Sequence, residues 1–170
     1  MPNLSNKILT ILVFDEDVKS TKEIISWLRL IGHKVQSCDT YDNFLDQITA
    51  NQYDIVLFDF NDSKPSELDS LHAVKFYRFT VAIKSEFSPK FILYTNRVSP
   101  SQHEIYLEDI SNARIDGILS KGSNLEQFLS QFISILNLPV SLAREWNRIA
   151  VKQVEFVSNV VKLHPDYGSD

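Results

Sequence analysis

Cysteine and glycine are scarce in this sequence of 170 residues, and each shortage excludes a class of function. Cys38 is the single cysteine, so the chain cannot form an internal disulfide, and a reducing, cytoplasmic location is expected. The four glycines do not form the phosphate-binding patterns G-x-G-x-x-G or G-x-x-x-x-G-K. The sequence therefore argues against dinucleotide and P-loop chemistry.

Clusters of positive charge and long apolar runs are also missing. The formal net charge is −5, so the surface would repel the phosphates of nucleic acid. No apolar run approaches the roughly 18 residues of a membrane span, and the N-terminus lacks the basic and apolar regions of a secretion signal. The four histidines have no ligand spacing. We therefore expect no nucleic-acid partner, no membrane contact and no histidine metal site.

Apolar residues are abundant, at 44%, and they fall into short runs separated by segments with helical spacing. The runs predict five strands, at residues 8–14, 34–38, 54–59, 91–95 and 115–119. Helices are expected between and after them, at about 20–31, from Thr40, 67–84, 100–113 and 124–136. This alternation is typical of an α/β fold, a doubly wound five-stranded parallel sheet of the flavodoxin-like order 2-1-3-4-5. The first helix is expected to begin at Ser20, because Ser20 to Glu23 has the pattern of a capping box.

The domain organisation expected from this pattern is a single domain with one additional C-terminal helix. Residues 1–137 form the domain, residues 138–163 form the helix, and residues 164–170 form a disordered tail. The apolar positions of the helix recur at three- and four-residue spacings. The helix either packs back on the domain, pairs with a second copy, or leads to an output domain. The continuous apolar stripe favours dimerisation or a linker over packing.

Acidic residues follow two of the predicted strands. Asp15 and Glu16 come directly after the first strand, and Asp59 ends the third. These two strands are neighbours in the order 2-1-3-4-5, so their carboxyl ends open on one crevice. Carboxylates that lie so close cannot all stay ionised without a cation. The sequence therefore predicts a Mg²⁺ site made by Asp15, Glu16, Asp59 and the backbone carbonyl of Asn61.

Two further polar residues, Thr95 and Lys121, are expected at the same edge, after the fourth and fifth strands. Transfer of a phosphoryl group to a carboxylate depends mainly on positioning and charge stabilisation. In that chemistry Asp59 would be the nucleophile. Lys121 would neutralise one phosphoryl oxygen, and the Thr95 hydroxyl would hydrogen-bond another.

Over about residues 8–136, these residues and the elements between them resemble the receiver domains of two-component response regulators. The matching pieces are Asp15-Glu16 after Ile-Leu-Val-Phe, Asp59 after Asp-Ile-Val-Leu-Phe, Thr95 after Phe-Ile-Leu-Tyr, and Lys121 after Asp-Gly-Ile-Leu-Ser. The stretch 76–80 also resembles the third helix of receivers attached to hybrid sensor kinases. The resemblance implies a signalling domain rather than an enzyme. It would take a phosphoryl group from a histidine kinase or a histidine phosphotransfer protein onto Asp59, with Mg²⁺, and switch a partner interaction.

Three positions depart from the family pattern and leave alternatives open. Asn96 stands where a small residue is usual, Ile118 where an aromatic residue is usual, and Gly122 where a proline is usual. These departures favour, as an alternative, an interaction module that works without phosphorylation. Another alternative is a haloacid-dehalogenase-like phosphatase with Asp15 as its nucleophile, because Asp15 to Asp17 matches the D-x-D opening of that class. The later acidic pair of that class is missing after Lys121.

Overall fold

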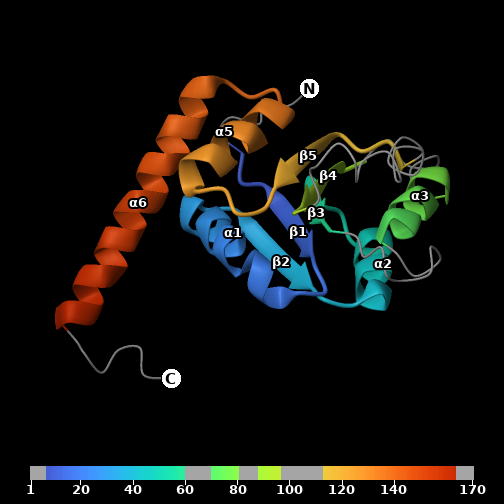
Figure 1. Ribbon diagram of the computed structural model, residues 1–170, viewed down its shortest axis with the longest axis horizontal. Coiled ribbons are helices and arrows are strands. Elements are labelled where there is room, and N and C mark those ends of the chain that lie inside the picture. Colours follow the sequence, from blue (N-terminus) through green and yellow to red (C-terminus); the bar gives the residue numbers. More distant parts are fainter. Residues whose placement is uncertain (1–6, 60–69, 81–87, 97–112, 164–170) are drawn as a thin grey trace.

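The computed structural model describes residues 7–59, 70–80, 88–96 and 113–163, which form a parallel sheet with helices on both faces (Figure 1). The strands are β1 (Thr10–Phe14), β2 (Lys34–Cys38), β3 (Ile55–Phe58), β4 (Lys90–Thr95) and β5 (Gly117–Ser120). Their order is β2-β1-β3-β4-β5, and every neighbouring pair is parallel. The predicted fold class and strand order are therefore confirmed.

The described helices are α1 (Val18–Ile31), α2 (Tyr41–Ala50), α3 (Ser70–Thr80), α5 (Leu125–Ile135) and α6 (Val140–Leu163). The helix predicted over 67–84 is seen as α3 in its described part, and the helix predicted over 100–113 lies almost wholly outside the described residues. None of the helices in the described ranges has both the length and the apolarity that crossing a membrane requires.

The core consists of two apolar clusters, one on each face of the sheet. Along β1, Ile11 and Val13 belong to the cluster under α1, α5 and α6, whereas Leu12 and Phe14 belong to the cluster under α2 and α3. This alternation follows from the two-residue period of a strand. All four residues of β3 are buried, as expected for a central strand that is covered on both faces.

The start of α1 differs from the prediction. The helix begins at Val18, and the Asp17 side chain caps it by accepting a hydrogen bond from the Lys19 N–H at 3.1 Å. Ser20, which the sequence favours as the cap, therefore lies inside the first turn. The prediction at Ser20 is wrong because an acidic residue three positions earlier supplies the capping oxygen.

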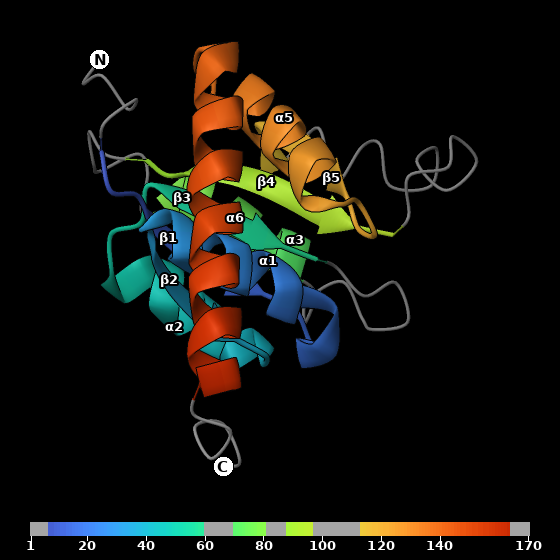
Figure 2. The ribbon, with the colours of Figure 1, turned by 90° about the vertical axis from the view of Figure 1, so that its left-hand side faces the viewer.

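The helix α6 has two halves with different surroundings. In its first half Leu142, Trp146 and Ala150 are buried, and the helix packs against α1 and α5, as Figure 2 shows. The Trp146 ring meets the His33 ring edge-on at 4.7 Å between centroids. In the second half Val154 is 52% exposed. The first half therefore packs back on the domain, which is the alternative that the sequence favoured less.

Candidate functional site

The carboxyl ends of β1, β3 and β5 place Asp15, Asp59 and Lys121 at one edge of the sheet. Backbone hydrogen bonds continue the sheet by one residue at two of these ends. The Asp59 N–H donates to the Phe14 carbonyl at 3.1 Å, and the Lys121 N–H donates to the Thr95 carbonyl at 3.0 Å. Asp59 and Lys121 are therefore held by the sheet itself.

The Lys121 ammonium lies between the two carboxylates. Its Nζ is 2.5 Å from Asp15 Oδ2 and 2.6 Å from Asp59 Oδ2. It also donates to Ser20 Oγ at 3.2 Å. The side chains of Lys121 and Asp15 are 7% and 6% exposed, and that of Asp59 is 19% exposed. Residues from three separate strand ends therefore form one buried ionic cluster.

The electrostatics of this cluster favour a charged lysine. Burial by itself lowers the pKa of Lys121, but hydrogen bonds to Asp15 and Asp59 and the charges of both carboxylates more than offset this, so the pKa is raised above its ordinary value. The ammonium also lies 5.6 Å from the centre of the Tyr94 ring. Burial first, and then the nearby carboxylates, raise the pKa of Tyr94 to about 12. The cluster holds two negative charges against one positive charge, which leaves it able to accept more positive charge.

The Asp15 carboxylate is oriented by local donors as well as by Lys121. Its Oδ1 accepts the Asp17 N–H at 2.8 Å, and its Oδ2 accepts the Ser20 hydroxyl at 2.6 Å. The sequence did not identify Ser20 as a site residue. Its position in the turn of helix that directly follows the Asp15 loop is the signal that could have found it.

Of the other predicted site residues, the structure describes Thr95 and Glu16 but not Asn61. Thr95 is buried at the carboxyl end of β4, where it is paired with Ser120. Glu16 is partly exposed next to Asp15, and Asn61 lies outside the described residues. Within the described ranges, no three acidic, histidine or cysteine side chains are arranged as a ready metal cluster. The oxygen donors of Asp15 and Asp59 nevertheless suit Mg²⁺, because they already share one cation.

Two residues that depart from the family pattern have structural explanations. Gly122 has φ of +82°, a conformation that proline cannot adopt, so the connection after β5 differs in backbone from one built on proline. Ile118 is partly buried and packs against the core cluster under α2 and α3. An aliphatic side chain therefore occupies the position of the expected ring.

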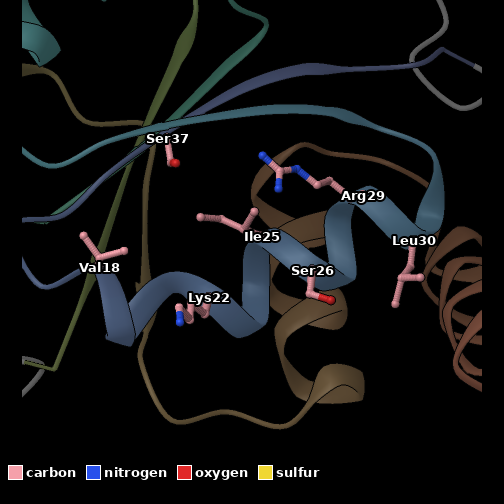
Figure 3. Close-up of a pocket in the computed structure, with 7 residues that line it drawn as sticks. All are labelled: Val18, Lys22, Ile25, Ser26, Arg29, Leu30 and Ser37. Atoms are coloured by element: carbon pink, nitrogen blue, oxygen red, sulfur yellow. The ribbon is translucent and has the colours of Figure 1, made fainter. Parts of the chain in front are cut away.

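Two surface hollows lie beside α1. One, of about 340 Å³, adjoins the ionic cluster and is lined by residues that include Ser20, Trp27, Tyr94 and Lys121. The other, of about 440 Å³, is lined by Val18, Lys22, Ile25, Ser26, Arg29 and Leu30 of α1 and by Ser37 of β2 (Figure 3). The second hollow shares none of the residues that contact the Lys121 ammonium.

Comparisons with known proteins bear on the fold. No family model matches the sequence, and no curated protein matches it. Among solved structures, the chemotaxis response regulator CheY4 of Vibrio cholerae is 19% identical, with a TM-score of 0.61 over 76% of this chain and 99% of its own. A putative response regulator from Chloroflexus aurantiacus is 21% identical, with a TM-score of 0.60 over 77% of this chain and 99% of its own.

A third similar structure is the response regulator TrrA from Thermotoga maritima, described as a complex with Mg²⁺ and BeF. It is 18% identical, with a TM-score of 0.56 over 75% of this chain and 98% of its own. These similarities span nearly the whole of the matched proteins, and the strand order of this chain is the one that the sequence predicted. The chain therefore has the fold of the response regulator receiver domains, as the resemblance in its sequence implied.

Proposed function

We propose that this protein is a phosphoacceptor of a two-component system, in which Asp59 receives a phosphoryl group from a histidine kinase or a histidine phosphotransfer protein. The observation that supports this most directly is the convergence of Asp15, Asp59 and Lys121, with both carboxylates within 2.6 Å of one ammonium. Asp59 has the more exposed carboxylate of the two, at 19% against 6%, so an incoming donor reaches it first. The protein is a signalling domain in this proposal and not an enzyme.

The transfer makes one bond and breaks one. A carboxylate oxygen of Asp59 attacks phosphorus, the P–N bond to the donor histidine breaks, and its electron pair leaves with the imidazole. Lys121 is placed to move from the carboxylates to a phosphoryl oxygen, because its ammonium already contacts Asp59. The Thr95 hydroxyl would hydrogen-bond another phosphoryl oxygen. These contacts stabilise charge that develops during transfer.

Mg²⁺ would be held by Asp15, Glu16, Asp59 and the backbone carbonyl of Asn61, and it would neutralise charge on the phosphoryl group. The net negative charge of the Asp15–Lys121–Asp59 cluster supports this assignment. The Mg²⁺ and BeF in the TrrA complex support it by analogy of fold.

The test is phosphorylation of the full chain by acetyl phosphate with Mg²⁺, followed by intact mass and peptide mapping. The wild type should gain one phosphoryl group on Asp59, and Asp59→Asn should gain none. Asp59→Asn should be as stable as the wild type or more so, because it removes one of two like charges at the cluster. Asp42→Asn, an exposed carboxylate of α2, is the matched control and should be labelled normally. Label on Asp15 would contradict the proposal and favour the phosphatase alternative.

A second candidate function is an interaction module that works without phosphate. Two observations favour it: Lys121 already neutralises much of the acidic cluster, and Ile118 supplies no ring for the usual aromatic switch. Wild-type protein that stays unlabelled by acetyl phosphate, while a binding partner recognises wild type and Asp59→Asn equally, would establish this second function.

The partner surface that we propose is the second half of α6. Val154 and Phe156 are 52% and 65% exposed there. A second copy of the chain pairing through this half, or an output segment that follows it, would cover these apolar side chains.

A further inference from the structure

We propose that Ser20 is a positioning residue that holds the Lys121 ammonium between the two carboxylates and so sets how readily Mg²⁺ displaces it. This inference rests on the proposed function, because the Mg²⁺ site belongs to that function. Ser20 comes from the first turn of α1, whereas the residues it contacts follow β1 and β5. Its Oγ lies 2.6 Å from Asp15 Oδ2 and 3.2 Å from Lys121 Nζ.

The hydrogen bonds of the ammonium show what Ser20 contributes. A lysine ammonium carries three N–H donors and no acceptor. In this cluster the three acceptors are Asp15 Oδ2, Asp59 Oδ2 and Ser20 Oγ. Ser20 is therefore the third hydrogen-bond acceptor of the ammonium, and it is the only uncharged one among these three. Without it, one donor of a side chain that is 7% exposed loses its protein acceptor.

The hydroxyl of Ser20 both accepts and donates a hydrogen bond. It accepts from Lys121 and has a single proton to donate, either to Asp15 Oδ2 at 2.6 Å or to the Asp17 carbonyl at 2.9 Å. When it donates to Asp15, it links the ammonium and the carboxylate through a second path beside their direct contact. This second path stabilises the position of the Lys121 ammonium between the two carboxylates.

A cation that enters the cluster must compete with this arrangement. Asp15 and Asp59 would hold Mg²⁺ through carboxylate oxygens, and Oδ2 of each residue accepts a hydrogen bond from Lys121. Mg²⁺ binding would therefore require the Lys121 ammonium to move, which would weaken its contact with Ser20. A hydrogen bond that is weakened when a ligand binds opposes that binding by the free energy that it loses. Removal of the Ser20 hydroxyl should therefore tighten Mg²⁺ binding, by roughly ten- to a hundredfold for one hydrogen bond to a charged group.

The experiment is a Mg²⁺ titration of the full chain, followed by tryptophan fluorescence, to which Trp27 contributes from the hollow that Ser20 and Lys121 also line. Ser20→Ala should lower the Kd for Mg²⁺, and Ser20→Thr, which keeps the hydroxyl, should stay close to the wild type. Ser26→Ala is the matched control, because Ser26 lies on the same helix and lines the separate hollow of Figure 3. An unchanged or higher Kd in Ser20→Ala, with normal binding by the wild type, overturns the role of Ser20 and leaves the proposed function intact.

A second measurement tests the same contact without metal. Urea unfolding of the wild type, Ser20→Ala, Lys121→Met and the double variant forms a double-mutant cycle. Ser20→Ala should cost stability when Lys121 is present and much less when it is absent. A cycle with no coupling overturns the inference. A wild type that gives no response to Mg²⁺ by fluorescence or by stability overturns the proposed metal site and, with it, the effect on Mg²⁺ affinity.

Discussion

Lys121→Met tests the ionic cluster most directly, because it removes a cation that both carboxylates contact. Two oxygens that lie 2.5 Å and 2.6 Å from the same atom are at most about 5 Å apart. At an effective dielectric constant of about 20, two unit charges at that separation repel by about 3 kcal/mol. Loss of one partner from a buried ion pair costs about 3 to 5 kcal/mol. Because the Asp59 side chain is 19% exposed, the lower figure applies, and we expect a loss of about 3 kcal/mol.

The assay is urea unfolding of the full chain, with and without Mg²⁺. In thermal unfolding of a chain of this length, the same loss of about 3 kcal/mol corresponds to a melting temperature lower by roughly 6 to 12 °C. Adding Asp59→Asn to Lys121→Met should restore most of the loss, since a single carboxylate charge then remains. Mg²⁺ at about 100 times its Kd should stabilise Lys121→Met by about 2.7 kcal/mol, provided that the carboxylates bind it.

Lys19→Met serves as the control. Lys19 is an exposed lysine that lines the hollow beside the ionic cluster, and within the described residues no hydrogen bond or ion pair joins it to Asp15 or Asp59. It should change stability by less than about 0.5 kcal/mol. The reasoning is refuted if Lys121→Met is as stable as Lys19→Met, or if Asp59→Asn gives no recovery in the Lys121→Met background.

Two further predictions concern the core. Burial lowers the pKa of His33 from 6.5 to about 4, and its Nδ1 accepts the Leu9 N–H at 3.2 Å. As the pH falls, the unfolded chain therefore binds a proton at this position before the folded chain does. The His33 contribution to stability is complete above pH 6.5 and declines by roughly 3 kcal/mol as the pH falls through 4. Unfolding of His33→Asn across this range should lack this decline, and a pH dependence identical to that of the wild type would contradict the prediction. In Gly117→Ala, the new Cβ would lie 2.6 Å from Ile135 Cγ2, so we expect a loss of about 1 to 3 kcal/mol in thermal unfolding. Ile135→Ala in the same background should remove the steric part of that loss, and equal effects of Gly117→Ala in both backgrounds would contradict the steric explanation.

The carboxylates of the site could be predicted from the sequence because strand ends are easy to locate. Each apolar run stops at a charged or polar residue, and parallel strands bring those residues to one edge. Lys121 was predicted to neutralise a phosphoryl oxygen, which stays a prediction, and the structure adds that its ammonium lies between Asp15 and Asp59. A sequence identifies the members of such a cluster more readily than their pairing, because pairing depends on distances between separate elements.

Ser20 shows why the rest of the site could not be predicted. Its position suggested a helix cap, and several residues near a helix start can supply a capping oxygen. Asp17 takes that role, which leaves the Ser20 hydroxyl to contact Asp15 and Lys121. Gly122 is similar: the sequence marked it as a departure from the family pattern, but only its φ of +82° shows that the backbone itself differs there.

The two halves of α6 should differ in how much stability the same kind of substitution costs. Ala150 is fully buried, so Ala150→Glu places an unpaired charge in the packed half and should lower the free energy of unfolding by about 3 kcal/mol or more. Val154 is 52% exposed one turn later, so Val154→Glu should leave unfolding of the monomer almost unchanged. If a second copy covers this half, Val154→Glu should also lower the mass measured by light scattering at high concentration, because an interface does not tolerate an unpaired buried charge. Equal destabilisation by both variants would show that the packed region extends beyond Ala150, whereas a mass that is the same for the wild type and Val154→Glu would exclude this surface as the site of self-association.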